Sequence, residues 1–214
     1  MQNYAAFDDL DALEEIAAIV HSEDGNPSED LSSEPEKYTV PDINKVLGWI
    51  KSLGVDTDDR KSPVNTDEND PAEARRLYWL NKNNSYITKT KTGRFVISYN
   101  PDAAEHKKDP TALCRNLLIE LSYYLLNINK TLPVGWSAAC NDTGADARNA
   151  HYLAEAIMLP KDVFMHYVKK NTFDARCSLN SVARDLGDKT NKDSYLSNAI
   201  QVKERGVLMG LWGR

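Results

Sequence analysis

Residues 109–127 read DPTALCRNLLIELSYYLLN, and the rest of the chain is organised around them. Asp109 suits the N-cap of a helix, and Pro110 suits the first helical position, where its missing N–H is not needed. Apolar residues then recur at the three- and four-residue spacing of a helix, at positions 114, 117, 118, 121, 124 and 125. The opposite face is apolar too, which predicts a helix over residues 111–127 that is buried on all sides.

One carboxylate, that of Glu120, lies in the middle of this predicted helix. A buried carboxylate is unfavourable unless it has hydrogen-bond partners, a raised pKa or a cavity around it. Glu120 is therefore the first candidate for a functional group.

Composition and length set the class of protein. A chain of 214 residues predicts one domain with appendages. No apolar run reaches the roughly 18 residues that a membrane helix needs, and the N-terminus lacks the pattern of a signal peptide. The three cysteines (Cys114, Cys140 and Cys177) form no C-x-x-C pair. We therefore expect a cytoplasmic protein without a disulfide framework, and the net charge of −6 argues against non-specific nucleic-acid binding by the whole molecule.

The charge is unevenly distributed along the chain. Residues 1–40 contain eleven acidic residues and one lysine, a net charge of −10, whereas residues 161–214 contain ten basic and six acidic residues, a net charge of +4. The acidic head and the basic tail either interact, within one chain or between chains, or form a solvated surface.

The chain divides into three parts. Residues 1–21 predict an acidic amphipathic helix, and residues 22–40 predict a flexible acidic linker, since they are rich in Glu, Asp, Ser, Pro and Gly. Residues 41–214 form the main domain. The helix docks on its own core, on a sister subunit or on another protein, and the candidate partner-binding residues on its apolar face are Phe7, Leu10 and Leu13.

The main domain is predicted to be α+β, mainly helical, with a small antiparallel sheet. A helix beginning at Pro41 is followed by a polar loop over 56–71 and a helix over 72–80. Residues 85–90 and 94–99 predict a β-hairpin around Gly93. After the central helix, an Ala-rich helix (Ala147, Ala150, Ala154) is stopped by Pro160 and has the central helix as its expected partner. Residues 161–214 form a helical subdomain, in which Gly206 is expected to end the last helix.

This order of elements resembles the ImmA/IrrE-type metallopeptidases over residues 72–210. The local patterns are IELSYYLL at 119–126 and AHYLAEAIMLP at 150–160. Members of that family carry a His-Glu-x-x-His helix, and a Glu on the next helix completes a zinc site. By this resemblance the two histidine positions fall on Ile119 and Tyr123, the third ligand falls on Asn149, and the general base falls on Glu120.

These replacements imply a degenerate, catalytically inactive member. A catalytic zinc site needs three protein ligands and an open position for water, and none of the three ligands is retained. We therefore expect no metal, no cofactor and no catalytic residue, with Glu120 as the remnant general base. The vestigial cleft comprises the following residues: Ile119, Glu120, Tyr123, Asn149 and His151.

Two interpretations of this cleft remain open. In one, Ile119 and Tyr123 fill the former metal space, and Glu120 is hydrogen-bonded to Tyr123 or to a nearby arginine. In the other, the filled groove still binds a peptide segment without cutting it. A separate alternative, a divergent hydrolase, would use Glu120 together with His151 and Glu155, which share a helix face.

The last helices, 179–187 and 194–205, look like a helix-turn-helix. Its possible nucleic-acid contacts are Asn198, Gln201, Lys203 and Arg205. The seven residues 187–193 are longer than the usual turn, and similar pairs close the metallopeptidase-like fold without touching DNA.

The resemblance therefore implies a protein-binding regulator of prophage or mobile-element origin, acting on a repressor- or antitoxin-like partner. The alternatives are a DNA-binding transcriptional regulator that uses the C-terminal pair and the divergent hydrolase.

Overall fold

The computed structural model describes residues 10–22, 35, 38–59, 84–138, 145–173, 176–177, 179–186, 202–203 and 205–211. The predictions for Phe7, Asn198, Gln201 and the helix 72–80 lie outside these residues, as does most of the acidic stretch 22–40. The described part is a mixed α+β structure that is mostly helical, with a small three-stranded sheet. None of its helices combines the length and the apolar content that a membrane crossing requires.

The sheet contains the predicted hairpin and one strand that the sequence did not predict. Strands β2 (Ser85–Lys89) and β3 (Phe95–Tyr99) pair antiparallel, and Gly93 in their turn has a φ of 84°. Strand β1 (Asp56–Asp59) pairs parallel with β3, so the strand order is β1-β3-β2. The prediction of a loop over 56–59 and of a purely antiparallel sheet was therefore wrong, because main-chain pairing holds a strand whose side chains are all polar.

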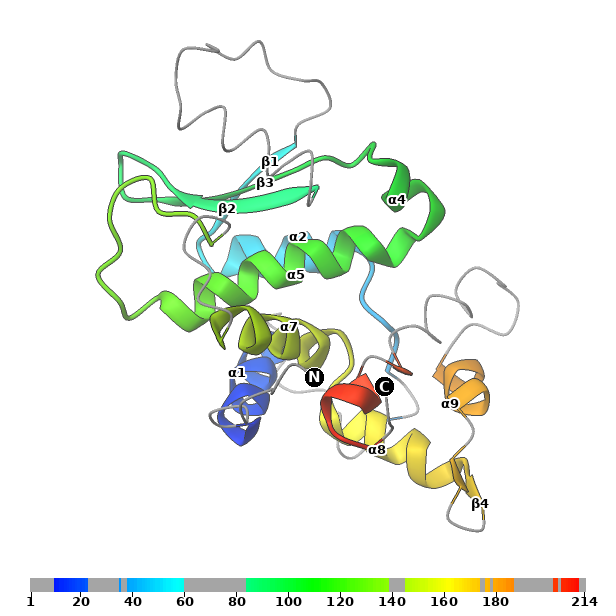
Figure 1. Ribbon diagram of the computed structural model, residues 1–214. Coiled ribbons are helices and arrows are strands. Elements are labelled where there is room, and N and C mark those ends of the chain that lie inside the picture. The colour runs from blue at the N-terminus through cyan, green and yellow to red at the C-terminus, as the bar shows by residue number, and fades with distance from the viewer. Residues whose placement is uncertain are drawn as a thin grey trace, which may run out of the picture.

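Helix α5 (Pro110–Asn127) lies under the sheet, as expected for the central element (Figure 1). The Asp109 carboxylate accepts a hydrogen bond from the main-chain N–H of Thr111 at 3.0 Å and so caps the helix. The three leucines of its central turns are fully buried: Leu117, Leu118 and Leu121. Helix α2 (Ile43–Ser52) packs beside α5, and the short helix α4 (Ala104–Lys108) precedes it.

Helix α7 (Ala145–Met158) crosses α5 on the side away from the sheet (Figure 1). Ala150 and Ala154 are completely buried, so the expected close contact of the Ala-rich helix with the central helix is confirmed. Helix α1 (Leu10–Ser22) packs on α7 and buries Leu13, Ala17 and Val20.

A second hydrophobic cluster lies between helix α8 (Lys161–Lys170) and helix α9 (Leu179–Leu186). Between these helices, strands β4 (Thr172–Phe173) and β5 (Arg176–Cys177) pair antiparallel. Tyr38 belongs to this cluster, together with Phe164, Val182 and Val202. Tyr38 therefore does not belong to a flexible linker, contrary to the prediction for residues 22–40, because its aromatic ring is buried in this cluster.

The last helix continues beyond its predicted end. Residues 205–208 are helical, so Gly206 lies inside the helix and does not end it. The end is formed at Gly210, which has a φ of 71°. The N–H of Gly210 donates to the carbonyl of Val207, and the N–H of Leu211 donates to that of Gly206, which is the Schellman pattern.

Candidate functional site

The side chain of Glu120 extends from helix α5 towards strand β2 and is buried. One carboxylate oxygen, Oε2, accepts a hydrogen bond from the main-chain N–H of Ile87 at 2.9 Å. The other, Oε1, accepts one from the hydroxyl of Ser85 at 3.3 Å. The prediction that Tyr123 or an arginine is the hydrogen-bond partner of Glu120 was wrong, because strand β2, which packs on α5, supplies both donors.

The N–H of Ile87 is available because β2 is an edge strand. Two residues further along, the N–H of Lys89 donates to the carbonyl of Trp136 at 2.9 Å, and the Lys89 carbonyl accepts from Gly135 at 2.8 Å. Alternate residues of a strand direct their main-chain groups to the same side, so those of Ile87 and Lys89 both point away from β3. The Glu120 carboxylate thus occupies the position at which a further strand would place a carbonyl oxygen.

Burial raises the pKa of Glu120 from its ordinary value of 4.5 to about 7. The hydrogen bonds from Ile87 and Ser85 oppose this effect, because they stabilise the ionised carboxylate and so lower the pKa. Burial is the larger effect. Near neutral pH the side chain is therefore present in both its protonated and its ionised form, whereas a surface glutamate is ionised.

The predicted cleft residues differ in their exposure to solvent. Tyr123 is 9% exposed and packs in the core, whereas Ile119 and Asn149 are half-buried. His151 lies on the exposed face of α7, so it does not face the buried Glu120 carboxylate. The expectation that His151 lines the cleft was therefore wrong, because its helix turns the alanine side, not the histidine, towards α5.

Glu155 has a role that the sequence did not predict. Its carboxylate Oε1 forms a buried ion pair with Nε of Arg115 at 2.9 Å, which joins α7 to α5. The available signal was a glutamate within residues 152–158, the C-terminal half of the helix, which is otherwise free of charged residues. Since Glu155 is paired in this way and His151 is exposed, the trio proposed for a divergent hydrolase is not assembled. In the described residues, no group of three or more His, Cys, Asp or Glu side chains is arranged to hold a metal ion.

The predicted partner-binding face of the N-terminal helix packs within the chain. Leu13 is 5% exposed, and Leu10 is half-buried against the same core. The assignment of Leu10 and Leu13 to a partner surface was therefore wrong for α1 in its docked position, because α7 already covers them. The residues of α1 that face outward are Asp11, Glu15, Ala18, Ile19 and Ser22.

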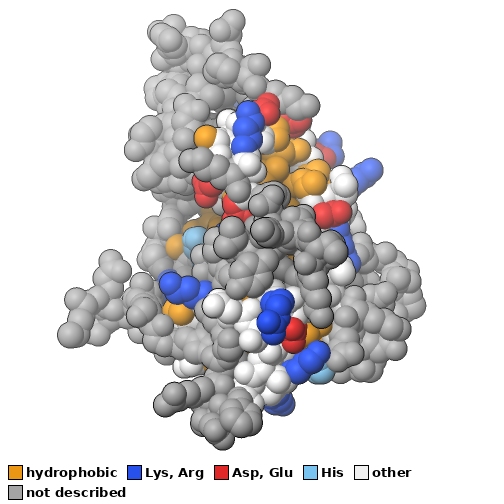
Figure 2. Space-filling model, turned by 90° about the vertical axis from the view of Figure 1, so that its right-hand side faces the viewer, with side chains coloured by type: hydrophobic (Ala, Val, Ile, Leu, Met, Phe, Trp, Pro, Cys, Tyr) orange, Lys and Arg blue, Asp and Glu red, His pale blue; other side chains and the backbone are white. Residues whose placement is uncertain are grey.

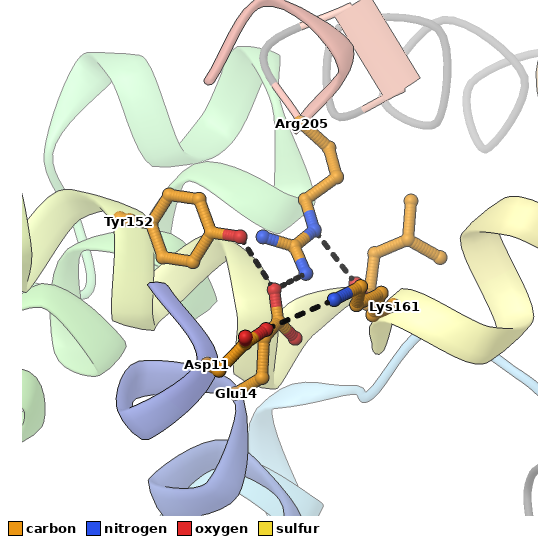
Figure 3. Close-up of polar contacts among 6 residues, drawn as sticks. Asp11, Glu14, Tyr152, Lys161 and Arg205 are labelled. Carbon is orange, nitrogen blue, oxygen red and sulfur yellow. Dashed lines mark hydrogen bonds and ion pairs between the residues drawn. The ribbon is translucent and has the colours of Figure 1, made fainter. Parts of the chain in front are cut away.

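Arg205 is not available to nucleic acid. It is completely buried, its Nε donates to the carbonyl of Leu159 at 3.2 Å, and its Nη2 forms an ion pair with Oε1 of Glu14 (Figure 3). The hydroxyl of Tyr152 donates to the same Glu14 oxygen at 2.6 Å. The prediction of Arg205 as a nucleic-acid contact was therefore wrong, whereas Lys203 is exposed.

Polar contacts join the acidic N-terminal segment (residues 1–40) to the basic C-terminal segment (residues 161–214). Lys161 forms an exposed ion pair with Asp11 at 3.2 Å. Burial raises the pKa of Tyr152 to about 12, so its phenol stays protonated and donates to Glu14 at ordinary pH. The acidic and basic segments thus interact within one chain, at Glu14–Arg205 and Asp11–Lys161.

Figure 2 shows the face that carries α4 and α9. Among the described residues on this face, Lys and Arg side chains are interspersed with Asp and Glu side chains and form no single basic strip. On α9 itself, Nε of the exposed Arg184 lies 3.8 Å from Oδ1 of Asp185. Such a mixed surface does not favour the phosphate contacts on which nucleic-acid affinity depends.

Searches against protein-family models, curated proteins and solved structures gave no match to this chain.

Proposed function

We propose that this protein is a non-catalytic, metallopeptidase-like regulator that acts by binding another protein. The observation that carries the proposal is the engagement of Glu120. A general base must face an activated water, but both oxygens of this carboxylate accept hydrogen bonds from β2. The positions that resemble zinc ligands carry Ile119 and Tyr123, which bind zinc poorly. The remnant base thus joins the central helix to the edge of the sheet.

The edge of β2 is a poor place for a peptide to bind. A peptide added as a further strand would need the outward N–H groups of β2. Glu120 occupies that of Ile87, and Trp136 occupies that of Lys89. The proposed partner therefore binds elsewhere.

The outward face of α1 suits the partner better. Asp11, Glu15 and Ile19 follow one another at four-residue intervals, so they form one stripe on the helix. Ile19 is 54% exposed, and it adds an apolar contact to the Glu15 carboxylate and to the Asp11 carboxylate, which also pairs with Lys161. A repressor binds DNA and so carries a basic surface, which is complementary to an acidic stripe. A repressor- or antitoxin-like partner fits this chemistry, and the resemblance to the metallopeptidases suggests that this protein itself is of prophage or mobile-element origin.

The test is capture of a partner by the full-length protein from cells that express it. We expect the wild type to retain a DNA-binding protein, and the Glu15→Lys/Ile19→Ser variant to lose it. The matched control is Lys51→Glu, which changes an exposed residue at the end of α2. Glu120→Gln should bind the partner as the wild type does, because its carboxylate lies away from the stripe.

Metal analysis tests the non-catalytic part of the proposal. We expect less than stoichiometric zinc in the purified protein. One zinc per chain, together with peptide cleavage that is lost in Glu120→Gln, would refute it.

A further inference from the structure

Three consecutive carbonyls at the C-terminal end of α7 each accept a hydrogen bond from a side chain in a different part of the protein. The ring Nε2–H of His21, in α1, donates to the carbonyl of Ile157 at 2.9 Å. The hydroxyl of Tyr38 donates to that of Met158, and Nε of Arg205 donates to that of Leu159. The last carbonyls of a helix have no partner within the helix, so these donors satisfy groups that would otherwise be unpaired.

The C-terminal end of a helix also carries partial negative charge. Arg205, from the last helix, supplies the positive charge at this end of α7. Its guanidinium lies 4.8 Å from the centre of the Tyr152 ring, and its Nη1 atom has no hydrogen-bond acceptor among the described residues. A completely buried guanidinium requires a carboxylate, and Glu14 of α1 provides it (Figure 3).

Helix α1 therefore has two distinct connections to this region. It packs on α7 through Leu13, Ala17 and Val20, and it neutralises Arg205 of the C-terminal segment (residues 202–203 and 205–211) through Glu14. If α1 left its position, the Arg205 guanidinium would lose the Glu14 carboxylate and keep its contacts with the Leu159 carbonyl and the Tyr152 ring. A guanidinium without its carboxylate is solvated better by water than by these contacts, so the segment that carries it would move towards water.

We propose that α1 is a releasable latch that couples the acidic N-terminal segment to the C-terminal segment. While α1 is docked, Glu14 holds Arg205 against the end of α7. When α1 is removed, the C-terminal segment detaches from α7. The fifteen residues 23–37 join α1 to Tyr38, and a chain of this length spans at most about 50 Å, which is long enough for α1 to leave without any break in the chain.

The coupling of α1 to the C-terminal segment needs no partner, so it remains testable when no partner is captured in the experiment above. If the proposed partner does bind α1 and draws it away from α7, this coupling is the route by which partner binding changes the C-terminal segment.

Hydrogen exchange measured by mass spectrometry on the full-length protein tests the coupling. We expect Glu14→Gln to raise the exchange rates of amides 205–211 roughly a hundredfold, with α5 and β2 still protected. Glu15→Gln is the matched control, because this neighbouring residue of α1 faces solvent, and it should leave all rates unchanged. Faster exchange in α1 with unchanged exchange in 205–211 would overturn the proposal.

A second variant separates the coupling from a general loss of stability. In Glu14→Gln/Arg205→Met the unpaired charge is absent, and an apolar side chain of similar length takes its place. We expect amides 205–211 to regain protection to within about tenfold of the wild type. If Glu14→Gln alone does not fold, the double variant decides: a protected C-terminal segment supports the latch, and an unprotected one overturns it.

Discussion

Replacing Glu120 with glutamine should remove a pH dependence from the stability of this protein. The carboxyl has a pKa of about 7 in the folded chain and 4.5 as its ordinary value, because burial favours the protonated form. Between these two values the folded state holds a proton that the unfolded state has released. Stability therefore falls as the pH rises through this window, and it is constant, as far as Glu120 is concerned, below and above it.

The magnitude follows from the width of the window. One pH unit corresponds to about 1.4 kcal/mol per proton, so a window of about 2.5 units corresponds to about 3 kcal/mol. Glutamine keeps an oxygen that accepts from Ile87 N–H and an amide that donates to Ser85 Oγ, and it has no charge to bury. The variant should match the wild type near pH 4.5 and exceed its free energy of unfolding by up to about 3 kcal/mol at pH 8.

Urea denaturation at a series of pH values from 4.5 to 8 measures this difference. The quantity of interest is the free energy of unfolding of the variant minus that of the wild type, since the titration of all other groups then cancels. Glu15→Gln serves as the control, because this exposed substitution should change stability by no more than about 0.5 kcal/mol at any pH. A difference for Glu120→Gln that does not vary with pH would refute the reasoning.

Other predictions concern the core and the capping of the central helix. Asp109→Ala should lower the free energy of unfolding by about 1 kcal/mol, because α5 loses its cap; urea denaturation measures this, and an unchanged midpoint would contradict it. Ala154→Leu should cost about 1–3 kcal/mol, since it overpacks the contact of α7 with α5, whereas Ala18→Leu on the exposed face of α1 should be nearly neutral by the same measurement. The Cys114 thiol, 2% exposed and with its pKa raised to about 12 by burial, should resist iodoacetamide at pH 8 until urea unfolds the protein; peptide mapping that finds it rapidly labelled in the native state would show that the site is open.

Features that depend on neighbouring residues were predictable. The central helix, its cap at Asp109 and the hairpin around Gly93 are set by spacing, capping chemistry and turn conformation, all of which act within a few residues. The burial of Glu120 was predictable as well, because apolar residues surround it on every face of the helix.

Other features carried no such local signal. Strand β1 consists of Asp-Thr-Asp-Asp, a composition that disfavours strands, and main-chain pairing with β3 holds it. The hydrogen-bond partners of Glu120 were not predictable either, because they depend on the order of the strands. The N–H of Ile87 points towards α5 because β2 lies at the edge of the sheet. The helix-turn-helix-like pattern placed Arg205 on the surface, where arginines usually lie, and nothing in that pattern indicated that the side chain is buried.

The sequence alone was enough to establish that residues 109–127 form a buried helix with one carboxylate in it. Folding determined what that carboxylate and the chain's other buried charges contact. Glu14 and Arg205 lie 191 residues apart, and they meet because α1 packs on α7 and Arg205 donates to the Leu159 carbonyl just beyond the end of α7. A buried charge must find its opposite wherever the packing of helices brings one, whereas helix periodicity and capping act only between close neighbours in the chain.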